Sequence, residues 1–279
     1  MLRKGDLTQG GITGTLLHFT LPMMVGSFLQ QCYNIADTLI VGQCIGAGAL
    51  AAVGSAYTLM VFLISVLLGL AMGSGTVFSL HYGAGNHVAL RRSIFSSFVL
   101  IGIVTLILNV AVFIWLDPIL RLLQVPQDIY GMMRSYSWII FCGIVFTFIY
   151  NFYASLLRAV GDSVTPLWFL AVSVVLNIAL DLFFILQLDW GIQGAASATV
   201  LAQGVAALGI IIYTYRRRPE LRWHHEDMCF DRTCLKEIAS FSTLTCVQQS
   251  VMNLGILMIQ GLVNSFGTAV MAAFAAAVK

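Results

Sequence analysis

The chain of 279 residues is 59% hydrophobic and only 9% charged, and its mean hydropathy is +0.91. Because a soluble domain carries roughly 25% charged residues, this composition excludes a soluble globular protein and predicts a helical protein that crosses a membrane several times. The formal net charge of +2 gives no reason to expect a nucleic-acid partner.

Apolar runs long enough to cross a hydrocarbon core of about 30 Å follow one another along the whole chain. They predict an all-α, polytopic membrane fold with seven spanning helices and the start of an eighth. The first run is too long for the apolar core of a signal peptide, so it is expected to be a retained span. The predicted spans cover residues 16–44, 50–81, 93–116, 130–158, 165–188, 194–215 and 235–266.

Lysine and arginine are distributed unevenly between the two ends of these spans. Eleven fall on one side, whereas only Arg121 and Arg134 fall clearly on the other. Since cytoplasmic loops carry an excess of Lys and Arg, the sequence predicts a plasma-membrane protein with a cytoplasmic N-terminus. The eleven residues are Arg3, Lys4, Arg91, Arg92, Arg158, Arg216, Arg217, Arg218, Arg222, Arg232 and Lys236.

The sequence repeats itself at a distance of six predicted helices. Residues 46–54 read GAGALAAVG, and residues 267–275, 221 positions further on, read GTAVMAAFA. An even number of helices restores the starting orientation, so we expect parallel repeats and a full length of about 450 residues with twelve helices. The predicted units are a six-helix lobe at 1–215, a cytoplasmic linker at 216–237 and the truncated start of a second lobe at 238–279.

Asp37 and Asp181 lie inside predicted spans, whereas the other ten acidic residues lie in loops, at helix ends or in the linker. A carboxylate at this depth costs about 2.5–3.5 kcal/mol, and no Lys or Arg is expected inside a span to offset that cost. Each carboxyl group should therefore be protonated, bound to a cation or exposed to a water-filled cavity. The alternative is that both are polar contacts that hold helices together.

Polar residues share a helix face with each aspartate, at spacings of three or four residues. At 1.5 Å per residue, Asp37 lies about 31 Å along the first helix and Asp181 about 22 Å along the fifth, so both are expected in the outer half of the membrane. The sixth predicted helix runs back and brings Thr199 to this depth. The two faces carry Gln30, Asn34 and Asp37, and Ser173, Asn177 and Asp181.

Carboxylate, amide and hydroxyl oxygens at one depth can hold a proton or a small hard cation such as Na⁺. A second group of potential metal ligands lies in the linker. Its spacing matches no tight zinc pattern, and the acidic residues beside it indicate a solvated loop, so no other metal is expected. The first set is Asp37, Asn177, Asp181 and Thr199, and the second is His224, His225, Cys229 and Cys234.

Four sequence elements, in this order and spacing, resemble the multidrug and toxic compound extrusion (MATE) family of secondary transporters. The resemblance covers nearly the whole chain and includes the six-helix repeat. The elements are LP at 21–22 with DTLIVG at 37–42, GAGN at 83–86 with RR at 91–92, LRAVGDSVTP at 157–166, and GAASAT at 194–199.

The resemblance implies two six-helix lobes around a cavity that opens alternately to either side. It implies a monomeric antiporter, not an enzyme, that needs no cofactor and exports organic cations and amphiphilic drugs in exchange for H⁺ or Na⁺. In the branch with ion coupling in the first lobe, the ion site corresponds to Asp37, Asn177, Asp181 and Thr199. The cavity surface corresponds to Gln30, Tyr33, Asn34, Tyr136 and Asn151.

Three alternatives compete with this interpretation. A lipid-linked oligosaccharide flippase of the same two-lobed plan would need basic residues in its cavity, and their expected absence from the spans favours cationic cargo. An intramembrane aspartyl protease needs a Gly-x-Gly-Asp element within a span, whereas the nearest sequence here, AVGD at 159–162, is expected in a loop. A truncated membrane protein that transports nothing is the third.

Overall fold

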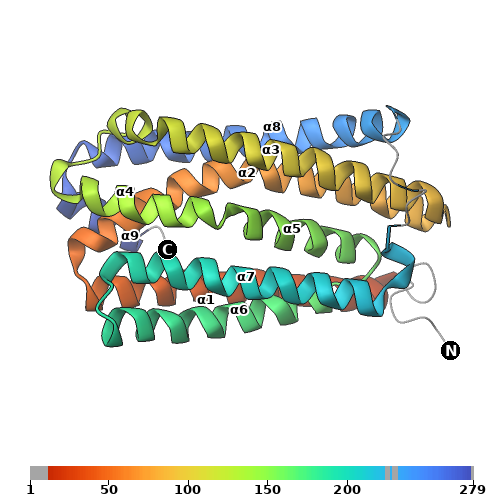
Figure 1. Cartoon of the computed structure of the whole chain (residues 1–279), viewed down its shortest axis with the longest axis horizontal. Helices are drawn as coiled ribbons and strands as arrows, with labels where there is room; N and C mark the ends of the chain where they lie inside the picture. The colour runs from red at the N-terminus through yellow and green to blue at the C-terminus, as the bar shows by residue number, and fades with distance from the viewer. Residues whose placement is uncertain (1–11, 224–226, 228–231, 278–279) are drawn as a thin grey trace.

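The computed structural model describes residues 12–223, 227 and 232–277. The regular elements in this part of the chain are all helical, and they lie side by side along one long axis (Figure 1). The predicted all-α, polytopic fold is confirmed. The elements are α1 (Ile12–Cys44), α2 (Ala47–Gly83), α3 (His87–Leu122), α4 (Gln127–Cys142), α5 (Ile144–Ala159), α6 (Val164–Leu182), the π-helical turn η1 (Phe183–Gln187), α7 (Gly191–Arg217), the 3₁₀ turn η2 (Pro219–Leu221), α8 (Arg232–Asn264) and α9 (Thr268–Ala277).

Five described helices, α2, α3, α6 with η1, α7 and α8, are long and apolar enough to cross a membrane. The α4–α5 pair adds a sixth span if its two halves are taken together. Helix α1 has 33 residues but is not among them. The length of α1 would suffice to cross a membrane. Its mean hydropathy is lowered by polar residues in its second half, which include Gln30, Gln31 and Asn34.

The predicted span at 130–158 is not one straight helix, because the structure divides it into α4 and α5, bent by 47°. The break falls at Gly143, whose N–H donates to the carbonyl oxygen of Ile140 (2.9 Å) rather than one residue further back. A Cβ atom on Gly143 would lie 2.6 Å from Cγ2 of Val200, so the missing side chain lets α7 pack against the break.

Two of the sequence elements form helix junctions. Gly85 has φ +69°, which favours glycine, and Asn86 next to it caps α3 by accepting a hydrogen bond from the backbone N–H three residues later (3.1 Å). Gly161 has φ +87°, and Asp162 accepts hydrogen bonds from the backbone N (3.0 Å) and Oγ1 (2.9 Å) of Thr165 in α6. These residues reverse the chain between α2 and α3 and between α5 and α6.

Helix α8 packs along the full length of α2, antiparallel to it. A Cβ atom on Gly69 would lie 2.4 Å from Cα of Cys246, and one on Gly73 would lie 2.4 Å from Cα of Ser242. Glycines four residues apart on α2 therefore let the two backbones approach closely. Near the other end of α2, Nδ2 of Asn264 donates to Oγ of Ser55 (3.1 Å).

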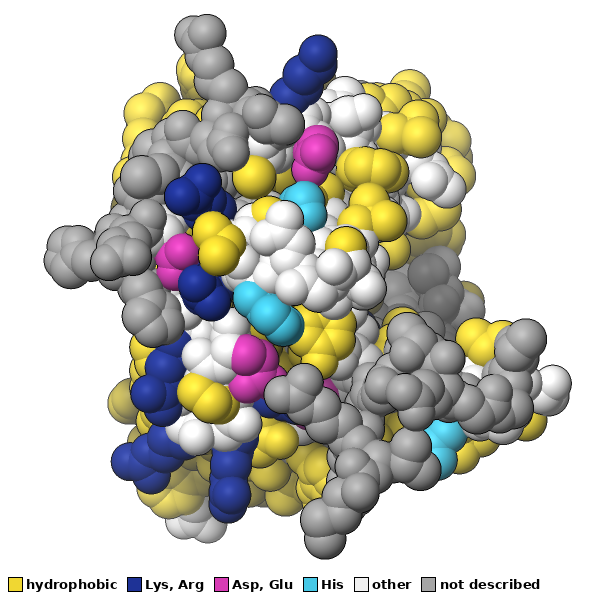
Figure 2. Space-filling model, turned by 90° about the vertical axis from the view of Figure 1, so that its right-hand side faces the viewer, with side chains coloured by type: hydrophobic (Ala, Val, Ile, Leu, Met, Phe, Trp, Pro, Cys, Tyr) yellow, Lys and Arg dark blue, Asp and Glu magenta, His cyan; other side chains and the backbone are white. Residues whose placement is uncertain are grey.

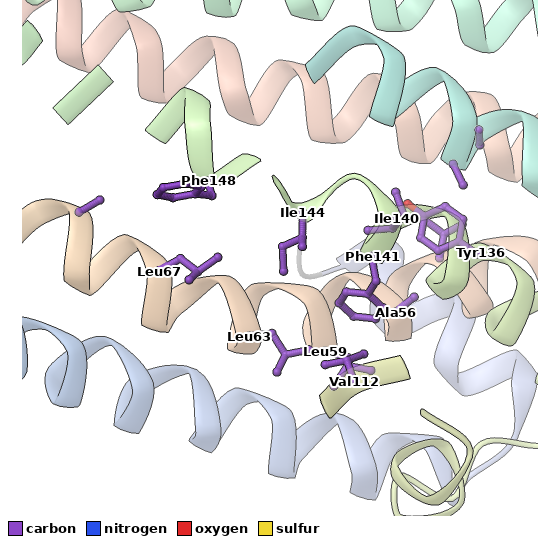
Figure 3. Packing of buried hydrophobic residues seen from close by; sticks show 14 of the residues in the cluster. Ala56, Leu59, Leu63, Leu67, Val112, Tyr136, Ile140, Phe141, Ile144 and Phe148 are labelled. Atoms are coloured by element: carbon purple, nitrogen blue, oxygen red, sulfur yellow. The ribbon is translucent and has the colours of Figure 1, made fainter. Parts of the chain in front are cut away.

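The hydrophobic core lies between α2, α3 and the α4–α5 pair. Figure 3 shows Leu59 and Leu63 of α2 near Val112 of α3, with Phe141 and Ile144 from either side of the α4–α5 break above them. All five side chains are buried. This core fixes the break relative to α2.

The basic residues gather at the end of the bundle where α1 begins and α7 ends, as Figure 2 shows for the exposed surface. Arg121 and Arg134 lie at the opposite end, on the last turn of α3 and in α4. The predicted separation of charge therefore holds for the described residues. Arg3, Lys4 and the side chain of Arg232 lie outside them.

The predicted linker at 216–237 overlaps two helices, since α7 continues to Arg217 and α8 begins at Arg232. The lobe boundaries themselves remain predictions. Of the linker's potential metal ligands, His224, His225 and Cys229 lie outside the described residues. Cys234 is buried in α8, and no group of three or more metal-binding side chains occurs in the part of the chain that the structure describes.

Candidate functional site

A cavity of about 300 Å³ lies between α1, α2, the α4–α5 pair, α6 and α7. Its wall is mostly aliphatic and aromatic, with amide, hydroxyl and carboxyl groups at intervals. Eight of the nine predicted site residues line it, from both the ion-site set and the cavity-surface set. They are Gln30, Tyr33, Asn34, Asp37, Tyr136, Asn151, Asn177 and Thr199.

The ninth residue, Asp181, lies just behind this wall and has no exposed surface. We assign to the Asn177 amide the orientation that satisfies both of its ends, because the opposite one places its oxygen near acceptors only. Its Nδ2 donates to Oδ2 of Asp181 (3.0 Å), and its Oδ1 accepts from the backbone N of Thr199 (3.2 Å) and from Oγ1 of the same residue (3.3 Å). Oδ1 of Asp181 has no hydrogen-bond partner among the described residues.

Tyr33 connects this buried group to the cavity surface. Its hydroxyl oxygen lies 3.3 Å from Oγ1 of Thr199. With Thr199 donating to Asn177, the hydroxyl of Tyr33 donates to Thr199, which gives a continuous chain of donors from Tyr33 to the carboxylate of Asp181. A ligand that contacts Tyr33 therefore touches a residue three hydrogen bonds away from the buried carboxyl group.

Asp37 lies in the wall of the same cavity and is 7% exposed. Asp181 lies behind the same wall, so the two carboxyl groups lie in one apolar region of the bundle. Like charges close together in an apolar interior cannot both be ionised at low cost. That the pair holds a proton or a cation stays a prediction.

The local chain geometry brings α6 and α7 together around this pair. Helix α6 widens into the π-helical turn η1 two residues after Asp181, at Phe183, and such turns often occur at functional sites. Gly194 allows α7 to start close to η1, because a Cβ atom there would lie 3.1 Å from Cβ of Phe184. Thr199 follows on the third turn of α7 and faces Asn177.

Sequence reasoning missed several polar residues of the cavity. Tyr57 of α2 accepts a hydrogen bond from Nδ2 of Asn34 (3.5 Å), and Oγ1 of Thr147 in α5 donates to Oε1 of Gln203 in α7. Gln203 could have been found, because it lies one helical turn after Thr199 on the same face. Nothing in the apolar surroundings of Tyr57 indicates its position.

The helices and the cavity define a polytopic, all-α membrane protein with a ligand-sized cavity between its spans. The MatE family model matches residues 22–183, more than half of the chain. The chain belongs to this family, which confirms the resemblance seen in its sequence.

The chain is 33% identical over 282 residues to the probable multidrug resistance protein YpnP of Bacillus subtilis (strain 168), a match that covers 99% of this chain and 61% of that protein. An inward-facing MATE transporter superposes with a TM-score of 0.82 at 25% identity, over 95% of this chain and 60% of that one. An outward-facing MATE transporter superposes with a TM-score of 0.83 at 22% identity, over 99% of this chain and 68% of that one. This similarity shows a shared fold. The chain thus spans about three fifths of the length of YpnP.

Proposed function

We propose that this chain provides the ion-coupling lobe of an exporter of organic cations and amphiphilic drugs, driven by entry of H⁺ or Na⁺. The observation that carries the proposal is the position of Asp37 in a cavity wall with Asp181 buried directly behind it. The family of the chain and its similarity to YpnP, a probable multidrug resistance protein, support the same function.

The cavity suits an amphiphilic cation. Asp37 supplies a negative charge, and aromatic rings beside it, including those of Tyr33, Tyr57 and Tyr136, can face a cationic group. Aliphatic residues of α2 and α6 offer an apolar surface for the rest of the ligand. Among the described residues that line this cavity there is no Lys or Arg.

The coupling step requires that the ion bind one conformation of the transporter better than the other. A proton on Asp37 or Asp181 removes one of the two like charges, and Na⁺ bound between them offsets both. Na⁺ would also need further oxygen ligands, which the hydroxyl of Thr199 and the amide of Asn177 can supply. Either ion would act through the hydrogen bonds that lead from Asp181 to Tyr33.

The remaining predictions about the whole protein belong to the same proposal. They are a plasma-membrane location with the basic end in the cytoplasm, a monomeric state, and a division into a six-helix lobe at 1–215, a linker at 216–237 and the start of a second lobe from residue 238. The uneven distribution of arginine along the bundle supports the orientation.

The test is ethidium accumulation in cells that express the full-length, two-lobed protein, with its presence in the membrane verified by fractionation. The proposal predicts lower accumulation than in cells without this protein. Proteoliposomes then identify the ion, because efflux should follow an imposed gradient of either H⁺ or Na⁺. Unchanged accumulation by membrane-inserted protein, and no response to either gradient, would count against export.

A further inference from the structure

A second cavity, of about 430 Å³, lies between α1, α5 and α6 on the side of the basic end. We name this second cavity the Arg158 cavity. It is adjacent to the first cavity, which contains Asp37, because the two have wall residues in common. The shared residues are Gln30, Tyr150, Asn151 and Leu170. The single charged residue among the described residues of the Arg158 cavity is Arg158.

Arg158 occupies the last turn of α5, and its side chain folds back along the helix. Its Nε donates to the carbonyl oxygen of Ala154, a residue of the cavity wall (3.1 Å). No ion pair involves Arg158 among the described residues. The two terminal nitrogens of its guanidinium, with four N–H donors, thus have no acidic partner in this part of the chain.

The nearest acidic residue in sequence, Asp162, is engaged elsewhere. Its Oδ2 pairs with Nη2 of Arg218 (3.2 Å) and accepts a hydrogen bond from Oγ1 of Thr165 (2.9 Å), while its Oδ1 caps α6. Asp162 therefore serves the junction of α5, α6 and α7, and Arg158 is left to the cavity.

Three other polar groups of the Arg158 cavity donate hydrogen bonds within the protein. The hydroxyl of Ser27 donates to the carbonyl oxygen of Met23 (3.2 Å), that of Tyr150 to Pro166 (3.0 Å), and Nδ2 of Asn151 to Thr147 (2.8 Å). The terminal nitrogens of Arg158 are therefore the strongest available donors, and a guanidinium prefers a carboxylate or phosphate because its planar fork binds two oxygens at once.

We propose that Arg158 binds the carboxylate or phosphate group of a ligand whose cationic group lies at Asp37. The two adjacent cavities would then hold a zwitterionic amphiphile lengthwise, with its apolar body between Tyr150 and Leu170. This inference rests on the proposed function for the cationic end of the ligand, and it adds an anionic group that the sequence-based expectation of purely cationic cargo lacks.

The test compares two dyes of nearly equal size in equilibrium binding to the full chain in nanodiscs. Rhodamine B carries a carboxylate and a cationic ring system, whereas its ethyl ester keeps only the cation. Arg158→Gln should weaken the binding of rhodamine B roughly tenfold, as expected for loss of a charge-assisted contact, and leave the binding of the ester within about twofold. Arg158→Lys keeps the positive charge but not the planar guanidinium, so its affinity for rhodamine B should lie between those of wild type and Arg158→Gln.

Arg134→Gln is the matched control, because Arg134 lies at the opposite end of the bundle and should affect neither dye. Equal affinity of wild type and Arg158→Gln for rhodamine B would overturn the proposal. If Arg158→Gln does not fold, the affinities of Arg158→Lys for the two dyes decide in the same way. An equal loss of affinity for both dyes would also overturn the proposal. No ion gradient is present, so a failure of this test is separate from a failure of ion-driven export.

An anionic lipid headgroup offers the same phosphate chemistry as a soluble ligand, and nanodisc composition distinguishes the two sources. If phosphatidylglycerol occupies the Arg158 cavity, adding it to phosphatidylcholine nanodiscs should weaken rhodamine B binding to wild type and not to Arg158→Gln. If the ligand is soluble, wild type should bind rhodamine B more tightly than Arg158→Gln by the same factor in both lipid compositions. A variant that binds rhodamine B as tightly as wild type does in both lipid compositions contradicts the proposal.

Discussion

At the scale of single residues, the hydrogen-bond chain from Tyr33 through Thr199 and Asn177 to Asp181 is the connection between the cavity surface and the buried carboxyl group. Thr199 is its central member and is 6% exposed. The hydroxyl is the only group of the Thr199 side chain that can form hydrogen bonds. Replacing this hydroxyl by a methyl group therefore interrupts the hydrogen-bond chain without changing the shape of the cavity wall.

Thr199→Val is therefore expected to lower the free energy of unfolding by about 1 kcal/mol and to weaken binding of the coupling ion. The measurement is thermal unfolding in detergent across a series of pH and Na⁺ concentrations. Thr214→Val is the matched control, since Thr214 is a buried residue of the same helix whose hydroxyl donates to the carbonyl oxygen of Ile210 (2.8 Å). An equal response of both variants to the ion would show that Thr199 has no special connection to the site.

Much of this site could be predicted from sequence, because a carboxyl group in an apolar run is unusual and helical spacing locates its neighbours. Asn34 and Asn177 were found in this way. Tyr57 and Tyr150 could not be, since tyrosine is common in spans and only the packing of α2 and α5 against α1 decides which rings face the cavity. The position of Arg158 in a cavity wall likewise depends on the way its side chain folds back toward Ala154.

At the scale of helices, the break between α4 and α5 was the feature that apolar periodicity did not predict. An unbroken run from residue 130 to residue 158 is compatible with one straight helix, and a glycine alone does not require a bend. The bend results from tertiary contact, because Val200 of α7 occupies the space beside Gly143. The same contact holds α7 where Thr199, the preceding residue, reaches Asn177.

Gly143→Ala should consequently destabilise the chain by about 1–3 kcal/mol, because its new methyl group would overlap the side chain of Val200. Adding Val200→Ala should recover part of that loss, and a double-mutant cycle from thermal unfolding measures the coupling. Gly131→Ala in α4 serves as the control, since nothing lies within 4 Å of a Cβ atom there. Additive effects at 143 and 200 would show that this contact does not hold the break.

At the scale of the whole molecule, the arginines at one end of the bundle define a direction across the membrane. The sequence predicted this asymmetry because loop charges can be counted once the spans are known. It did not predict how closely α8 would pack on α2, which depends on Gly69 and Gly73 facing Cys246 and Ser242. Small residues of this kind are common throughout the chain and mark a contact only when the partner helix is known.

The orientation can be tested with single cysteines at the two ends, in a chain whose native cysteines are replaced. Arg217 at the end of α7 and Gln127 at the start of α4 are both exposed, so Arg217→Cys and Gln127→Cys should both accept a thiol reagent in lysed cells. With a membrane-impermeant maleimide on intact cells, only Gln127→Cys should react. Labelling of Arg217→Cys alone would reverse the proposed orientation.

The most direct test of the central claim separates coupling from drug binding. Asp181→Asn keeps the size of the side chain and removes its charge, so it should abolish efflux driven by an H⁺ or Na⁺ gradient in proteoliposomes while equilibrium drug binding changes by less than about threefold. Asp37→Asn should also abolish driven efflux. If both variants export at the wild-type rate under every gradient, Asp37 and Asp181 do not carry the driving ion, and they only hold the helices together.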